Sequence, residues 1–104
     1  MLPITHTWGH ELVWASTELY SSRMLVIKDG EKTPYVYNRH RDKTIFVLQG
    51  CLMLVVEGIN KMLNEGESYH VIPKIMHRMV ALKGDVTLLE VGMPLEDDEV
   101  LVEA

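Results

Sequence analysis

The sequence has little of several features that mark common classes of protein. It contains a single cysteine, Cys51, among 104 residues, which excludes a disulfide framework and a cysteine-based zinc site within one chain. Basic residues are in the minority, since 10 Lys and Arg stand against 15 Asp and Glu, and the net charge is −5. Nucleic acids and anionic membranes attract basic surfaces, so we expect neither as a partner.

Long hydrophobic stretches are also missing. The longest uninterrupted apolar run, Cys51–Val56, is far shorter than the roughly 20 residues that cross a bilayer as a helix. The chain does not open with a charged segment followed by an apolar one, so no signal peptide is expected. These absences predict a cytoplasmic protein that folds as a single domain over residues 1–104.

The residues that are present favour short β-strands. Glycine and proline divide the middle of the chain into pieces too short for stable helices, at Gly30, Pro34, Gly50, Gly58, Gly66 and Pro73. Only the segment 16–22 is compatible with a helical turn, with Ser16 or Thr17 as its cap. Runs rich in β-branched, aromatic and aliphatic residues predict strands over 12–15, 23–28, 34–38, 44–48, 51–56, 68–72, 77–82 and 86–91. About eight to ten short strands indicate a sandwich or a small barrel.

Two groups of residues have the spacing of a known pair of sequence signatures. The first signature of the cupin superfamily reads Gly, His, His, Glu, Gly, and its spacing is met here by Gly30, Val36, Asn38, Lys43 and Gly50. The second signature runs from a Gly through a Pro-x-Gly segment to a His, and its spacing is met here by Gly66, the segment Ile72–Lys74 and His77.

Within that superfamily, the sequence resembles the small cupins similar to the C-terminal domain of bifunctional mannose-6-phosphate isomerases. Thr7–Gly9 is similar to the Pro-Trp-Gly entry of that group, Asp42–Gly50 to its Asp-Glu-Thr-Ile-Tyr-Val-Leu-Glu-Gly, and His77-Arg78 to its His-Arg pair. The resemblance extends from about Trp8 to Pro94. It implies an all-β double-stranded β-helix, which is the cupin or jelly-roll barrel.

The resemblance also implies a homodimer, because cupins of this length usually pair. The continuously apolar run Cys51–Val56 predicts a strand covered on both faces, either across the barrel interior or at a subunit contact. Met53 and Met62 would add to the covered outer face.

The family's divalent metal does not suit the residues at its ligand positions. Cupins hold the ion with two His and one Glu from the first signature and one His from the second, and those positions are here Val36, Asn38, Lys43 and His77. Val36 has no donor atom, the neutral amide oxygen of Asn38 is a weak ligand, and the ammonium of Lys43 repels a cation. Of the four positions, only that of His77 holds a side chain that binds such an ion well, so we predict neither a metal nor another cofactor.

The lysine at position 43 indicates that the family's metal position serves here as a ligand site without a metal. If its ammonium replaces the ion, Asn38, Lys43 and His77 line a ligand site that carries a positive charge. Neither signature holds an acidic residue to balance it, so we expect a bound anion, a lowered pKa of Lys43, or a side chain turned to solvent. Whether His40 or His70 contributes stays open, and the segment Asn38–Arg41 is interpreted as a charged loop at the surface.

Three functions are compatible with these residues. The first is a small-ligand-binding cupin for a sugar or a sugar phosphate. The second is a sugar isomerase or epimerase, with His77 and Lys43 as its acid–base pair. The third is an accessory barrel without a site. Because neither signature offers a carboxylate to orient His77, binding ranks above catalysis.

Overall fold

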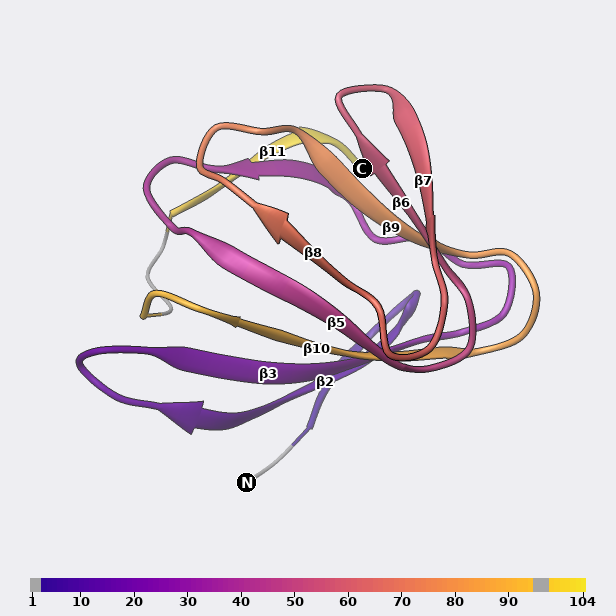
Figure 1. Ribbon diagram of the computed structural model, residues 1–104, viewed down its shortest axis with the longest axis horizontal. Coiled ribbons are helices and arrows are strands. Elements are labelled where there is room, and N and C mark those ends of the chain that lie inside the picture. The colour runs from indigo at the N-terminus through magenta and orange to yellow at the C-terminus, as the bar shows by residue number, and fades with distance from the viewer. Residues whose placement is uncertain (1–2, 95–97) are drawn as a thin grey trace.

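The computed structural model describes residues 3–94 and 98–104, which form strands, turns and loops without a helix (Figure 1). In chain order the strands are β1 (Ile4–His6), β2 (Gly9–Ser16), β3 (Ser21–Ile27), β4 (Tyr35–Asn38), β5 (Lys43–Gln49), β6 (Leu52–Val56), β7 (Ile59–Leu63), β8 (Ser68–Val71), β9 (His77–Ala81), β10 (Val86–Gly92) and β11 (Glu99–Glu103). Each strand range predicted above overlaps one of these strands. The short strands β1, β7 and β11 lie outside the predicted ranges.

The strands form two antiparallel sheets that face each other (Figure 1). One sheet has six strands in the order β1-β2-β3-β10-β5-β8, and the other has five in the order β11-β4-β9-β6-β7. From β3 to β6 and again from β7 to β10, each successive strand crosses from one sheet to the other. This alternation builds a double-stranded β-helix, so the predicted all-β fold is confirmed.

The segment 16–22 does not form a helical turn, so that prediction is wrong. It ends β2, turns the chain and begins β3. The hydroxyl oxygen of Thr17 accepts hydrogen bonds from the backbone N–H groups of Leu19 and Tyr20, each at 3.1 Å. Thr17 therefore has the capping chemistry expected of it, but it closes a turn between two strands.

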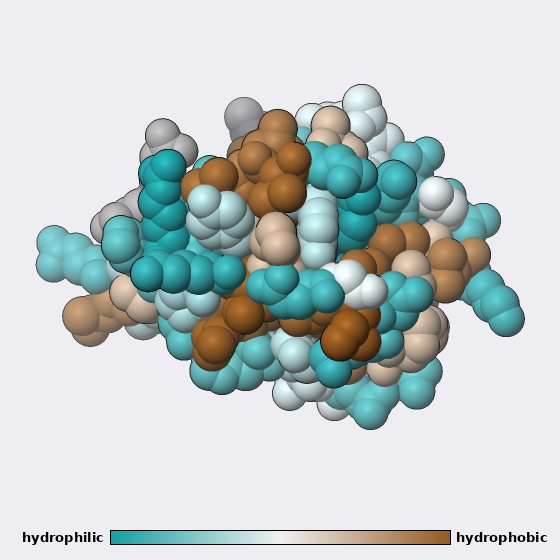
Figure 2. Space-filling view, turned by 90° about the horizontal axis from the view of Figure 1, so that it is seen from above, coloured by the Kyte–Doolittle hydropathy of each residue, from teal (hydrophilic) through white to brown (hydrophobic). Residues whose placement is uncertain are grey.

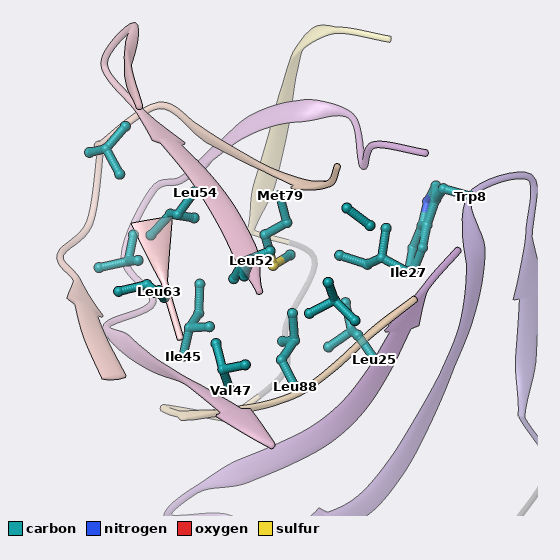
Figure 3. Packing of buried hydrophobic residues seen from close by; sticks show 14 residues of the cluster. Trp8, Leu25, Ile27, Ile45, Val47, Leu52, Leu54, Leu63, Met79 and Leu88 are labelled. Carbon is teal, nitrogen blue, oxygen red and sulfur yellow. The ribbon is translucent and has the colours of Figure 1, made fainter. Parts of the chain in front are cut away.

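The core is apolar and lies between the sheets (Figure 3). Alternate residues of each strand point inward, and full burial of such a side chain contributes about 1.5–3 kcal/mol. The buried cluster consists of Trp8, Leu25, Ile27, Ile45, Val47, Leu52, Leu54, Val56, Leu63, Val71, Met79, Ala81, Val86 and Leu88.

The inward positions change from apolar to polar towards one end of the barrel. Lys43 begins β5, and the buried Glu90 lies near the end of its antiparallel neighbour β10. In the opposite sheet, His77 begins β9 and Asn38 ends β4, and these two strands are also antiparallel neighbours. The fold thus brings polar residues from four strands to one end, which we call the polar end.

The outward face of β6 is only partly covered within the chain. Leu52, Leu54 and Val56 are buried, whereas Met53 and Val55 are half-buried. Seen from the side of the five-stranded sheet, hydrophobic residues lie in separate groups among hydrophilic ones (Figure 2). Over the described residues, no helix has the length and apolar character needed to cross a membrane.

Candidate functional site

Three residues predicted to line a site lie at the polar end. Asn38 and His77 are on neighbouring strands, because Val36 pairs with His77 across the ladder between β4 and β9. Lys43 lies on β5 in the opposite sheet, and both it and His77 are only 1% exposed. Of the described residues that are fully buried, Lys43 is the bulkiest. These side chains therefore lie between the sheets, and their role in binding a ligand stays a prediction.

Lys43 shares a buried carboxylate with two arginines. Glu90 is 0% exposed, and its Oε2 lies 3.2 Å from Nζ of Lys43. Arg23 donates from Nε to Oε1 at 3.0 Å and from its terminal nitrogen to Oε2 at 3.2 Å. Arg41 donates to Oε1 at 2.5 Å. One carboxylate thus contacts three cationic side chains.

These contacts correct two predictions made from the sequence. The expectation that no acidic group balances Lys43 is wrong, because Glu90 stands outside both signatures on the strand beside β5. The interpretation of Arg41 as part of an exposed loop is also wrong. Its guanidinium is buried and also donates to the carbonyl oxygen of Met93 at 2.9 Å and to the hydroxyl of Ser21 at 3.2 Å.

The polar contacts continue to the edge of the six-stranded sheet. Arg23 donates to Oε2 of Glu11 at 2.6 Å, and the other oxygen of Glu11 lies 2.7 Å from Nε2 of His6. The ring of His6 stacks on Trp8, with 4.4 Å between ring centroids. The row crosses the adjacent strands β1, β2, β3, β10 and β5. Its inner part is called the charged cluster below and consists of Glu11, Arg23, Arg41, Lys43 and Glu90, of which Arg23 is half-buried and the others are buried.

Cations outnumber carboxylates in the charged cluster, and this shapes its electrostatics. Burial alone raises the pKa of Glu90, but the charges of Lys43, Arg23 and Arg41 outweigh it and hold that pKa well below its usual range. Burial is also the strongest influence on Lys43 and lowers its pKa. The carboxylate of Glu90 opposes this lowering, while Arg23 and Arg41 add to it. Lys43 is therefore the member whose charge is least favoured.

His77 and Asn38 each present an acceptor without a donor. Nδ1 of His77 lies 2.9 Å from the carbonyl oxygen of Ile75, so this nitrogen carries the proton and donates it. Nε2 is then an acceptor, and like Oδ1 of Asn38 it is buried without a hydrogen-bond partner in the described part of the chain. Burial, followed by the charge of Lys43, lowers the pKa of His77 to about 4. Its imidazole is consequently neutral near neutral pH.

The residues present do not fit the divalent metal of the superfamily. The side chain at the Glu position is the buried Lys43, which is already paired with Glu90, and the first His position is Val36. No group of three metal-ligating side chains occurs within residues 3–94 and 98–104. The absence of a metal in the purified protein stays a prediction, which elemental analysis tests.

The other two histidines of interest lie outside the buried site. His70 of β8 is exposed and its Nε2 lies 2.6 Å from Oδ1 of Asp42. The side chain of His40 is exposed beside a hollow of about 40 Å³, which has room for about one water molecule. This hollow is lined by His40, Arg41, Met93, Pro94 and Asp98. A larger hollow of about 450 Å³ lies against β1 and β2, away from Asn38, Lys43 and His77.

Comparisons with known proteins agree with this architecture. The family model for the C-terminal part of mannose-6-phosphate isomerase matches residues 3–103. Among curated proteins, no sequence matches the chain.

Solved structures at 13 to 20% identity share the fold. KdgF from Halomonas sp. has a TM-score of 0.78 and 20% identity, over 88% of this chain and 84% of that one. A sugar phosphate isomerase of the cupin superfamily from Silicibacter pomeroyi has a TM-score of 0.76 and 18% identity, over 85% of this chain and 60% of that one. The capsular polysaccharide assembling protein CapF from Staphylococcus aureus has a TM-score of 0.89 and 13% identity, over 99% of this chain and 34% of that one.

Proposed function

The chain belongs to the mannose-6-phosphate isomerase C-terminal family, and from this premise we propose that it binds a small hydroxylated ligand, a sugar or a sugar phosphate, without a metal. The site is the polar end of the barrel, with Asn38, Lys43 and His77 as the contacting residues. The names of two proteins with the same fold, a sugar phosphate isomerase and a capsular polysaccharide assembling protein, support a carbohydrate.

The observation that carries this proposal is the pair of unpartnered buried acceptors. Oδ1 of Asn38 and Nε2 of His77 accept hydrogen bonds, and a buried acceptor left without a donor costs about 1–3 kcal/mol. The hydroxyl groups of a sugar donate such bonds and also accept them from Lys43. The hollow near His40 has room for about one water molecule, so a ligand reaches Asn38, Lys43 and His77 when Arg41, which lies between that hollow and the carboxylate of Glu90, moves aside.

Titration with D-mannose and with D-mannose 6-phosphate, followed by calorimetry and by amide and imidazole NMR, tests the proposal. Binding is expected to shift the Nε2 resonance of His77. His77→Gln and Asn38→Ala are each expected to weaken the affinity for the sugar by about fivefold or more, which is the value of one hydrogen bond. His70→Gln is the matched control, because that ring is exposed on β8. If neither sugar binds, or if both bind His77→Gln as tightly as the native protein, the proposal fails and the accessory barrel is favoured.

A second candidate, a sugar isomerase or epimerase, is supported by how His77 is held. General acid–base catalysis needs an oriented imidazole, and the carbonyl oxygen of Ile75 fixes the tautomer that leaves Nε2 free as a base. Lys43 would supply the proton to the other side of the reacting carbon. Incubation of mannose 6-phosphate in D₂O tests this, because catalysis would exchange the proton next to the carbonyl in native protein and not in His77→Gln.

A further inference from the structure

The charged cluster is not balanced when all of its members are ionised. Within residues 3–94 and 98–104, the carboxylates that pair with the side chains of Arg23, Arg41 and Lys43 are those of Glu11 and Glu90, so three positive charges meet two negative ones. One positive charge is then in excess at a place where Lys43 is 1% exposed and Glu90 is 0% exposed. A buried charge without a partner is costly, so a neutral cluster is strongly favoured.

The structure also shows which member can give up its charge. Arginine is not deprotonated in proteins, and Arg23 and Arg41 together occupy both oxygens of Glu90. Lys43 is the third cation on the same carboxylate and the only one that can lose a proton. Without that proton, two arginines balance two carboxylates. The remaining N–H groups of Lys43 still donate to Glu90, and its lone pair becomes available.

We infer that Lys43 is an amine nucleophile that forms an imine with the carbonyl group of an aldehyde or ketone, for which the open-chain form of a sugar is the natural class. This inference rests on the function proposed above, because the same site must admit the ligand. A desolvated lysine beside other cations is the setting in which amines act in this way.

The step balances with the groups that are present. The nitrogen of Lys43 attacks the carbonyl carbon, a C–N bond forms, and the carbonyl oxygen takes up a proton while the nitrogen releases one. The product of this addition is a carbinolamine. The free Nε2 of His77 then accepts the second proton of the nitrogen and returns it to the hydroxyl group, which leaves as water when the C=N bond forms. Amine and carbonyl compound become imine and water. The imine formed in this way is neutral, so Arg23 and Arg41 still balance Glu11 and Glu90.

Reductive trapping tests the inference on the intact protein. The protein is incubated with D-glyceraldehyde, a small hydroxylated aldehyde, and sodium cyanoborohydride near neutral pH, and the adducts are mapped by peptide mass spectrometry. Lys43 is expected to be modified at least about tenfold faster than Lys61, because a neutral amine attacks a carbonyl group and an ammonium does not. Lys61→Arg, a change at a partly exposed position on β7, leaves the modification of Lys43 unchanged.

The pH profile separates nucleophilic from merely structural roles. In Arg41→Gln the cluster is balanced with Lys43 charged, so its modification near neutral pH falls about tenfold and recovers at higher pH. Modification of surface lysines without Lys43, or an unchanged pH profile in Arg41→Gln, overturns the inference.

Sugar titration without the reductant distinguishes the two proposals. Native protein that binds D-mannose but is not trapped at Lys43 overturns the imine and leaves the binding function standing. Trapping at Lys43 without any sugar binding supports the amine and overturns the binding function.

Discussion

Glu90 is the residue on which the polar end depends. It is fully buried, and it receives hydrogen bonds from Arg23 and Arg41 as well as the ion pair with Lys43. The desolvation of such a carboxylate is offset only while its partners remain in place. The consequences of removing one partner therefore depend on which charge is left unbalanced.

Glu90→Gln is expected to lower the free energy of unfolding by about 3–5 kcal/mol, because it leaves the buried cations around it without their carboxylate. Lys43→Met, in contrast, leaves two arginines with two carboxylates and is expected to change stability by less than about 1.5 kcal/mol. Urea denaturation of the three proteins measures both changes.

Asp85→Asn is the control for this comparison, because Lys28 and Asp85 form an exposed pair at 3.4 Å and its loss is expected to leave the free energy of unfolding nearly unchanged. If Lys43→Met is as damaging as Glu90→Gln, the charge balance described for the cluster is wrong.

His77 makes the stability of the fold depend on pH. The folded pKa of about 4 lies below the ordinary value of 6.5, so the unfolded chain binds the proton first as the pH falls. The contribution of the neutral His77 to the free energy of unfolding is complete above about pH 6.5. It is lost as the pH falls from about 6.5 to about 4, with a slope of up to about 1.4 kcal/mol per pH unit.

Denaturation midpoints across this pH range are expected to fall less steeply for His77→Gln than for the native protein. His70→Gln serves as the control, since its exposed ring does not lie in the core. Parallel curves for native protein and His77→Gln would show that the imidazole is not neutralised by burial.

At the scale of the strands, side-chain alternation explains what the sequence could reveal about the site. A strand has a period of two, so the signature spacing is enough to place Asn38, Lys43 and His77 on inward positions. The same period identifies Glu90 as inward, because it continues the series of Val86 and Leu88 on β10. Side-chain alternation along β10 therefore predicts an inward carboxylate at Glu90.

The partners of Glu90 could not be found in this way. Arg23 lies 67 residues away in sequence, and its contact depends on β10 lying between β3 and β5. A single sequence carries no local signal for that strand order. The strands β1, β7 and β11 lie outside the predicted ranges for a different reason, since all three are edge strands with mostly exposed side chains and little apolar alternation.

Gly92 allows β10 to approach β5 at the polar end. It pairs with Lys43, and a Cβ atom at Gly92 would lie 2.3 Å from the carbonyl oxygen of Asp42 and 2.8 Å from Cα of Lys43. Gly92→Ala must therefore push the two strands apart. We expect a loss of about 3 kcal/mol in unfolding free energy, at the upper end of the cost of overpacking.

Gly66→Ala is the matched control for this prediction. A Cβ atom there meets nothing within 4 Å, and only the positive φ of 82° opposes it, at about 1–2 kcal/mol. Equal losses for the two variants would mean that the close approach at Gly92 is relieved without moving the strands. Amide NMR of Asp42 and Lys43 reports such a movement directly.

At the scale of the whole molecule, the outer face of the six-stranded sheet is the most continuous apolar surface that the strand registers define. Leu12 pairs with Met24, Met24 with Leu89, and Leu89 with Phe46, so one apolar row crosses β2, β3, β10 and β5. Leu48 and Val91 flank this row and are 44% and 43% exposed. Contiguous apolar patches of this kind mark sites of association.

We expect the protein to be a homodimer in which two copies bury this row against each other. A second copy is the occupant that fits best, because the central row of this sheet face has no charged side chain and a two-fold axis can pair the face with itself. Light scattering or sedimentation is expected to give twice the chain mass of 11.9 kDa. The run Cys51–Val56 with Met53 and Met62 predicts a different contact, on the five-stranded sheet, and two variants separate the two faces. Phe46→Lys places a charge in the row and should give monomers, whereas Met62→Lys, at a 50% exposed residue of β7, should leave the dimer intact. A native mass of 11.9 kDa would rule out the dimer, and dissociation by Met62→Lys alone would move the interface to the five-stranded sheet.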